Sequence, residues 1–205
     1  MPHRTIDTIE QLERLYVAPK GTSLSKEIPK LNAHYRAFVE AAPFILLATS
    51  GPGGLDCSPK GDEPGFVKIL DDRTVAIPDR PGNNRLDGLR NIVADPRVAL
   101  LFIVPGVGET LRVNGRAVIS DDPELLAMFA VNGKLPRTVT VVTIDAAYIH
   151  CPKAFIRSHL WNPEHFVERS RLPTLGQMAA AFSDGEVDAA KYDREAPARY
   201  ATQLY

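Results

Sequence analysis

Apolar positions recur along this chain with two different spacings. Short apolar runs bounded by turn residues are typical of strands, whereas apolar residues three to four positions apart are typical of helices. The runs predict strands over residues 44–49, 55–59, 66–70, 74–77, 98–104, 110–119 and 138–144. The helical spacing predicts helices over residues 7–16, 31–39, 85–93, 123–129, 153–161 and 175–182. The tail after residue 184 is polar and alanine-rich, and its pattern predicts no particular element.

The clearest strand covers residues 110–119, where polar and apolar side chains alternate. Its two faces carry Leu111, Val113, Gly115, Ala117 and Ile119 on one side and Thr110, Arg112, Asn114 and Arg116 on the other. The predicted strands do not alternate regularly with helices, so the pattern does not fit a parallel sheet built from βαβ units. It predicts a mainly β fold with peripheral helices, in which a small antiparallel barrel carries the helices on its outside.

The chain of 205 residues is long enough for one sizeable core. We expect residues 1–42 to form an N-terminal helical arm that packs on the barrel, because this segment is too short for a core of its own. Residues 43–175 would form the barrel, and residues 176–205 a C-terminal helix and tail.

Composition and charge limit the classes of partner that we expect the protein to bind. The formal net charge is −1, so no global field favours nucleic acid or an anionic membrane. The longest aliphatic run, residues 98–104, is far too short to span a bilayer, and the N-terminus has no apolar signal region. We therefore expect a cytoplasmic protein without a nucleic-acid or membrane partner. Two cysteines, Cys57 and Cys151, do not make a disulfide framework.

Several common catalytic motifs are missing from the sequence. It contains neither a G-x-S-x-G nucleophile elbow nor a G-x-x-x-x-G-K-[ST] phosphate loop. The glycine pair Gly106 and Gly108 lacks a third glycine and precedes a strand instead of a helix. The histidines show no H-E-x-x-H spacing, and nothing near His150 and Cys151 completes a metal site, so we expect no metal.

Cations and amides gather in the loops of the central stretch. Residues 81–85 form a loop that leads into a predicted helix, where Asn84 and Arg85 add donors to the free N–H groups of the helix start. Lys60, Lys68 and Arg112 lie on predicted strands nearby in the sequence. Each alone also fits a solvated turn, an exposed lysine or an ion pair across strands. Together they predict a phosphate site beside a sheet.

Segments 58–62, 82–85, 95–102, 111–117 and 151–161, in this order, resemble the pyridoxamine 5′-phosphate oxidase-like family of FMN-binding split barrels, in particular its uncharacterised bacterial branch. The resemblance covers about residues 30 to 175. It implies a six-stranded antiparallel FMN-binding split barrel and a homodimer with two FMN sites at the interface. Both expectations follow from the resemblance and not from the periodicity.

The resemblance also implies which residues hold the cofactor. The phosphate would be gripped by the loop of Asn83, Asn84 and Arg85, and the preceding strand end would support the isoalloxazine through Ile77, Pro78 and Asp79. The remaining contacts would come from Ser58, Pro59, Lys60, Phe66, Val67 and Lys68 at one ring edge, from Thr110 or Arg112 of the partner subunit, and from Arg157 and Trp161 in the C-terminal part.

The chain departs from the oxidase itself in three places. Residues 66–69 only approximate the R-x-V-L-L-K string, Ile77 and Pro78 replace a tyrosine-threonine pair, and the C-terminal Arg-x-His substrate motif has no counterpart. These departures argue against pyridoxine phosphate as the substrate and leave flavin binding intact. We therefore expect an FMN-dependent oxidoreductase acting on an unknown small molecule, with no catalytic residue identified. The alternatives are a non-catalytic carrier of a flavin, a deazaflavin or haem, and a plain structural barrel.

Overall fold

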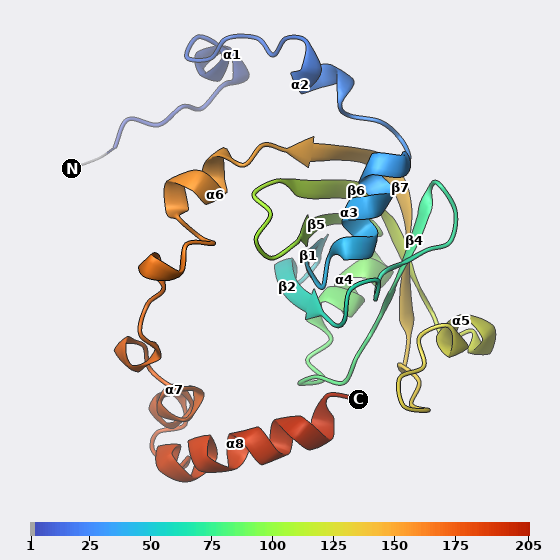
Figure 1. The fold of residues 1–205 in the computed structure, drawn as a ribbon. Coiled ribbons are helices and arrows are strands. Elements are labelled where there is room, and N and C mark those ends of the chain that lie inside the picture. The colour runs from blue at the N-terminus through green and yellow to red at the C-terminus, as the bar shows by residue number, and fades with distance from the viewer. Residues whose placement is uncertain (1–2) are drawn as a thin grey trace.

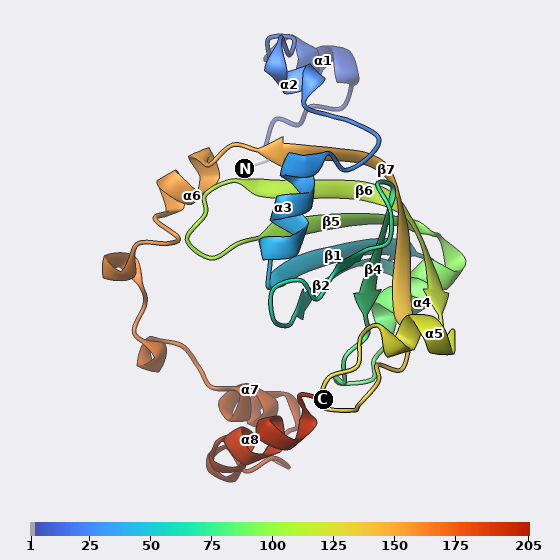
Figure 2. The same ribbon diagram turned by 45° about the vertical axis from the view of Figure 1, so that its right-hand side comes forward.

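One curled antiparallel sheet forms the centre of the molecule. The computed structural model describes residues 3–205. Its strands are β1 Phe44–Gly51, β2 Gly54–Gly61, β3 Lys68–Ile69, β4 Thr74–Pro78, β5 Arg97–Ile103, β6 Thr110–Ser120 and β7 Val139–His150. They are ordered β2-β1-β5-β6-β7-β4-β3, so that β2 and β3 form the two edges. The sheet curls so that its two edges approach each other, which makes a split barrel (Figures 1 and 2).

The mainly β fold predicted from the sequence is confirmed, with one strand more than the six that the family resemblance implied. Strand β3, predicted over residues 66–70, consists of only two residues paired with β4. Strand β7 is longer than predicted, because it continues beyond residue 144 while pairing with β6 as far as His150. Along its first residues β7 also pairs with β4, so this one strand joins both halves of the sheet.

A β-bulge between Asn114 and Gly115 bends the long β6–β7 pair. A Cβ atom on Gly115 would lie 2.1 Å from the carbonyl oxygen of Thr143 on β7. Only glycine lets the two backbones approach this closely. The apolar face predicted for this strand is buried, with Leu111 and Val113 fully enclosed and Ala117 only 1% exposed.

Helix α3, Ala33–Ala41, covers the open face of the barrel (Figure 2). The Asn32 side chain accepts a hydrogen bond from the Tyr35 backbone N–H and caps its start. The apolar face of the helix buries Tyr35 and Val39 in the main core. Around them lie the inward-facing side chains of the strands, Ile45, Leu47, Val75, Ile77, Leu100, Phe102, Leu111 and Val113 among them.

Helix α4, Asp87–Ala94, packs against β1 and β2 through a close contact. The buried Asn91 side chain donates hydrogen bonds to Thr49 Oγ1 and to the Gly54 carbonyl oxygen, both at 3.2 Å. A Cβ atom on Gly51 would lie 2.5 Å from Asn91 Oδ1, and one on Gly88 would lie 3.0 Å from Asp56 Oδ2. These contacts place the start of α4 directly beside β2.

Residues 3–25 lie outside the core, whereas Ile28 and Leu31, just before α3, pack into it. Helices α1, Ile9–Glu13, and α2, Thr22–Ser25, bury none of their side chains. Helix α1 is shorter than the helix predicted over residues 7–16, because it spans only five residues. Between α2 and α3 the chain joins the barrel through its backbone, where Ile28 bridges to Ala147 and the Leu31 backbone N–H donates to the Asp72 carbonyl oxygen.

The segment after β7 runs around one side of the barrel and then passes below it (Figure 1). It contains α6 Lys153–Ser158, the 3₁₀ turns Pro163–His165 and Arg169–Arg171, α7 Leu175–Phe182 and α8 Ala189–Gln203. Helix α6 ends before residue 161 because His159 adopts a left-handed conformation with φ 52°. The short helix α5, Pro123–Ala127, follows its Asp122 cap as predicted, and α8 occupies the tail for which the sequence pattern predicted no element.

Candidate functional site

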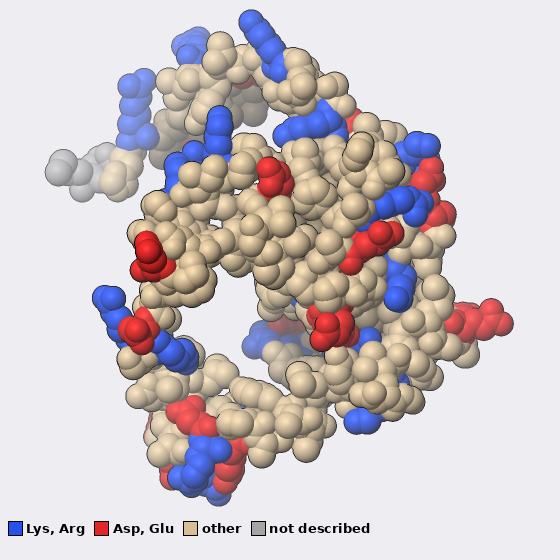
Figure 3. All heavy atoms as spheres, in the orientation of Figure 1, with Lys and Arg blue, Asp and Glu red and all other residues tan. Residues whose placement is uncertain are grey.

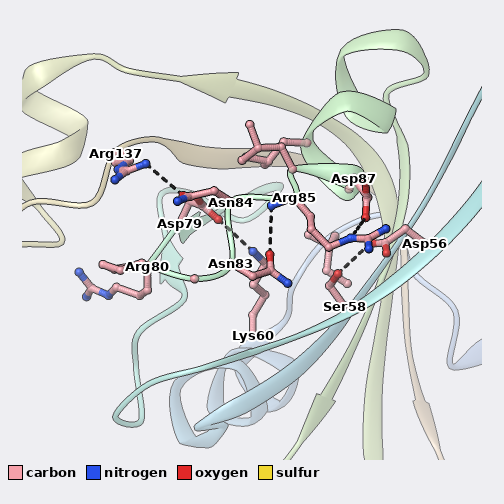
Figure 4. A pocket seen from close by; sticks show the side chains of 16 residues that line it. Asp56, Ser58, Lys60, Asp79, Arg80, Asn83, Asn84, Arg85, Asp87 and Arg137 are labelled. Atoms are coloured by element: carbon pink, nitrogen blue, oxygen red, sulfur yellow. Dashed lines mark hydrogen bonds and ion pairs between the residues drawn. The ribbon is translucent and has the colours of Figure 1, made fainter. Parts of the chain in front are cut away.

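A cavity of about 250 Å³ lies where the two sides of the split barrel meet (Figure 4). Strand β2 supplies one wall, on which Asp56, Ser58 and Lys60 alternate with outward-facing residues. The loop that follows β4, residues 79–86, supplies the opposite wall. The first turn of α4, Leu47 of β1 and Arg137 complete the lining. The cavity is therefore made by segments that are distant in the sequence.

Two ion pairs join the walls across the split. Lys60 Nζ lies 3.0 Å from Asp79 Oδ1, with both side chains about one fifth to one quarter exposed. Next to it Arg80 Nε lies 2.7 Å from Asp62 Oδ2, and the Asp62 side chain is only 5% exposed. Arg80 also donates through Nη1 to the Phe129 carbonyl oxygen at 2.8 Å. Strand β2 is thus tied to the end of β4 although no backbone ladder connects them.

The loop before α4 holds Arg85 at the mouth of the cavity. Asn84 and Leu86 both adopt left-handed backbone conformations, with φ 57° and 63°. The Arg85 backbone N–H donates to Asn83 Oδ1, and Arg85 Nε donates to Asp87 Oδ2 at 2.7 Å. The hydrogen bond from Arg85 to Asp87 raises the pKa of Arg85 further above its ordinary value. This contact leaves the two terminal nitrogens of the guanidinium available to a ligand.

The donor set of the cavity fits a phosphate group. Its lining carries the four cations Lys60, Arg80, Arg85 and Arg137 and the three carboxylates Asp56, Asp79 and Asp87, which leaves an excess of one positive charge. Leu86, the N-cap of α4, gives its helix no side-chain cap. The free N–H groups of the first turn add to this positive potential. Ser58 is not a free donor, since its hydroxyl donates to Asp56 Oδ2 at 2.7 Å.

The structure brings six of the predicted site residues together at this cavity, namely Ser58, Lys60, Asp79, Asn83, Asn84 and Arg85. Pro59 lies on the opposite, exposed face of β2. Val67, Ile77 and Pro78 are buried, with Val67 and Ile77 in the core. Phe66 and Lys68 line a separate small cavity that they share with Arg80 and Phe129.

The other four predicted residues do not line the cavity of this protomer. Thr110 is buried at the start of β6, and Arg112 Nη1 donates to the Tyr148 hydroxyl at 2.8 Å. Trp161 Nε1 donates to the Val107 carbonyl oxygen at 2.9 Å, which fixes the end of the α6 segment against the β5–β6 loop. Arg157 is exposed on α6.

A histidine lies next to this second group. His150 pairs with Thr110 in the sheet, and its Nε2 atom is buried without a hydrogen-bond partner among residues 3–205. Burial lowers the pKa of His150, and the nearby charges of Arg112 and Lys26 lower it further. In the same described range, no three histidine, cysteine or acidic side chains are grouped to hold a metal ion. Cys57 and Cys151 are both free and exposed.

Sequence reasoning missed Asp56, Arg80, Asp87 and Arg137. Asp56 shows a usable signal, because it shares the period-two face of Ser58 and Lys60. Arg137 carries no such signal: it precedes β7 and reaches the loop only in the folded chain, where its Nη1 donates to Asn84 Oδ1 at 3.1 Å.

These features define the class of protein as an antiparallel split barrel with a cation-lined cavity at its split. Residues 31–151 match the family model described as pyridoxamine 5′-phosphate oxidase, and the chain belongs to this family. Within residues 3–205 the polypeptide contains no helix that is both long and apolar enough to cross a membrane.

Solved structures with similar folds share little sequence with the chain. HupZ from Group A Streptococcus is 15% identical, covers 57% of this chain and 91% of its own, and has a TM-score of 0.47. A protein related to general stress protein 26, from Clostridium acetobutylicum, is 12% identical over 57% of this chain and 85% of its own, with a TM-score of 0.43. A structure named F420 reductase is 20% identical, covers 57% of this chain and 98% of its own, and has a TM-score of 0.42. No curated protein matches the chain significantly.

Proposed function

We propose that the cavity at the split binds the phosphate of FMN and that the chain is an FMN-dependent oxidoreductase acting on a small molecule. One observation carries this proposal. Arg85, Lys60 and the uncapped start of α4 converge on a single cavity, in a chain that belongs to the pyridoxamine 5′-phosphate oxidase family. FMN, when bound, supplies the electron transfer through its isoalloxazine ring.

The residues of the cavity would divide the work of binding. The terminal nitrogens of Arg85 suit a bidentate contact with phosphate oxygens, whereas Lys60 acts as a compact point charge. Asp79 holds Lys60 in place through the 3.0 Å contact, and Asp87 holds Arg85 in the same way. The Asn83 amide nitrogen remains a further donor, because only its oxygen is engaged by the Arg85 backbone.

The size of the cavity argues for a site completed by a second copy of the chain. Its volume of about 250 Å³ is below the range of roughly 300–1,000 Å³ typical of cavities that bury most of a ligand. The cavity thus suits the phosphate end of FMN better than the whole cofactor. We propose a homodimer in which Thr110 or Arg112 of one protomer, together with Arg157 and Trp161, borders the flavin held by the other.

A titration of flavin-free protein tests the phosphate assignment. We expect the Arg85→Ala variant to bind FMN at least tenfold more weakly than the native protein, which is the loss expected for a charge-assisted contact. Arg90→Ala is the matched control, since Arg90 lies on the adjoining helix, is exposed and does not line the cavity. Riboflavin, which lacks the phosphate, should bind weakly and equally to all three proteins. Equal FMN affinity of the native and Arg85→Ala proteins would remove the assignment.

The oxidoreductase part has a separate test. The FMN-loaded protein is mixed with NADH or NADPH without oxygen, and the bleaching of the flavin absorption is followed in time. A catalyst should be reduced and then reoxidised in repeated rapid cycles when an acceptor is supplied. A protein that binds FMN tightly but shows no such cycle with either donor is a carrier, and this result would leave only the binding proposal.

A further inference from the structure

A second and larger cavity adjoins the one at the split. It has a volume of about 870 Å³ and lies between α8 and the loop of residues 81–83. The two cavities share Arg80, Pro81, Gly82 and Asn83. In the space-filling view the molecule is hollowed between the C-terminal segment and the barrel (Figure 3). A ligand in this cavity would therefore lie beside whatever the first cavity holds.

An arginine in the wall of this cavity lacks a partner. The guanidinium of Arg199 makes no hydrogen bond or ion pair among residues 3–205, and its Nη2 is enclosed by protein, so a ligand in the cavity would accept from the other guanidinium nitrogens. The guanidinium carbon lies 4.4 Å from the ring centre of Tyr192 and 5.5 Å from that of Tyr200. The two rings favour the positive charge, but they cannot replace an oxygen acceptor. A guanidinium that lines a cavity without an acceptor of its own can form charge-assisted hydrogen bonds with a ligand carboxylate.

Helix α8, which carries Arg199, is held in place at both of its ends. At the far end the Tyr205 hydroxyl donates to Asp62 Oδ1 at 2.6 Å, and its ring lies under the Arg80 guanidinium. Lys134 Nζ donates to the Tyr205 carbonyl oxygen at 2.8 Å. At the near end Asp193 of α8 accepts a hydrogen bond from the Gly176 backbone N–H of α7. Helix α8 is thus attached to the barrel and to α7, and the cavity between them is preformed.

The formal charges of the cavity lining balance, and Arg199 is the cation among them without an ion-pair partner in residues 3–205. The lining contains two carboxylates, Asp62 and Glu63. Asp62 is already neutralised by Arg80 at 2.7 Å. Among residues 3–205 no carboxylate forms an ion pair with Arg199, while three tyrosines, at positions 192, 200 and 205, add flat apolar surface.

We propose that this cavity binds a small planar aromatic carboxylate. The carboxylate accepts hydrogen bonds from Arg199, and the aromatic ring packs among the tyrosines. Because the cavities share the wall of residues 80–83, this ligand lies beside the loop proposed to hold the FMN phosphate; that position relative to FMN rests on the function proposed above, whereas the binding itself does not.

Benzoate and benzamide are suitable probes, because they have the same ring and differ in charge. Binding is measured by ligand-detected NMR titration on the native protein, on Arg199→Gln and on Arg194→Gln. Arg194 is an exposed arginine of the same helix that does not line the cavity. We expect the native protein and Arg194→Gln to bind benzoate alike, and Arg199→Gln to bind it at least tenfold more weakly. Benzamide should bind weakly to all three.

The result is separable from folding and from the flavin. Unchanged far-ultraviolet circular dichroism of Arg199→Gln shows that α8 persists, and an Arg199→Lys variant that keeps part of the affinity shows that the charge matters. FMN affinity should be the same in native protein and Arg199→Gln, since Arg199 does not line the first cavity. Benzoate binding without FMN binding would contradict the proposed function alone. Equal benzoate affinity of the native protein and Arg199→Gln would overturn the proposal. It would also be overturned if the native protein bound no benzoate and the replacement of Arg199 changed the oligomeric state.

Discussion

Lys60 Nζ lies 3.0 Å from Asp79 Oδ1, and this contact joins segments that stand toward opposite ends of the sheet order. Arg80 and Asp62 form a second contact across the same gap at 2.7 Å. Side chains, rather than a backbone ladder, therefore close this barrel. The candidate phosphate cavity lies at the place where they do so, and changes that loosen the closure should affect both stability and ligand binding.

Asp62 should make the stability of the protein depend on pH. Burial raises the pKa of its carboxyl, but hydrogen bonds from the Tyr205 hydroxyl, the Glu63 backbone N–H and Arg80 outweigh this and lower the pKa below its ordinary value. Such a group contributes stability that is fully present above its unfolded pKa, about 3.9, and is lost as the pH falls through the folded value. We expect Asp62→Asn to be less stable at neutral pH and to lose less stability below about pH 4.

Urea unfolding at a series of pH values measures this effect. Asp72→Asn is the control, because Asp72 forms a similar pair with Lys30 on the surface, where the two side chains are 48% and 56% exposed. An exposed pair of this kind contributes between about 0 and 1 kcal/mol. Identical pH profiles for Asp62→Asn and the native protein would show that the buried pair does not couple closure to pH.

Replacement of Asn91 should move the first turn of α4. The Asn91 side chain donates to Thr49 Oγ1 and to the Gly54 carbonyl oxygen, and Leu has a similar volume but no donor. Asn91→Leu leaves a carbonyl oxygen unpaired, and we expect a loss of about 1–3 kcal/mol in the free energy of unfolding. FMN affinity should fall as well, because α4 positions Arg85. The neighbouring exposed Arg90→Leu is the control, and a stability loss of equal size there would contradict the role of Asn91.

A methyl group at Gly115 should disrupt the bulge of β6. The added Cβ atom would lie 2.1 Å from a backbone oxygen of β7, which no side-chain rotation can relieve. We expect Gly115→Ala to lower the free energy of unfolding by about 3 kcal/mol or more. Gly53→Ala provides the comparison, since a Cβ atom there meets nothing within 4 Å, and it should change stability by less than about 0.5 kcal/mol. Chemical denaturation of both variants decides whether the bulge requires glycine.

A mixing experiment tests whether the flavin site is shared between two protomers. Arg85→Ala and Arg112→Ala should each bind FMN poorly when purified alone. In a mixed dimer one site carries both changes and the other carries neither, so mixing should restore binding to about one quarter of all sites when protomers pair at random. Flavin content after dialysis gives the fraction. Native FMN binding by Arg112→Ala alone, or no recovery on mixing, would exclude Arg112 from the site.

The fold was largely predictable because its strands have strong local patterns. Residues 110–119 alternate cleanly, and the structure buries the predicted face. The extension of β7 through Asp145 and Ala146 was not predictable, because these residues have low strand propensity and are held by pairing with β6. Helix α8 was missed since its polar composition lacks an apolar stripe and Pro197 lies inside it.

The candidate sites were predictable only where their residues cluster in the chain. Lys60 follows a strand pattern, and Arg85 follows a turn that leads into a helix, so both carry local signals. Arg137 and Arg199 carry none, because each reaches its cavity through tertiary structure alone. A site that forms only when the barrel closes, or when the C-terminal helix packs beside it, cannot be predicted from any one segment of the sequence.

The strand order has a consequence for how the chain assembles during synthesis. The β3–β4 hairpin is made early, but its partner in the sheet is β7, which emerges about sixty residues later. Until then the hairpin has no strand to pair with except itself, and the walls of the first cavity remain apart. Pairings between distant segments form late, so we expect both cavities to be among the last features to appear. A ligand that needs them would bind only the finished barrel and would keep it closed by mass action.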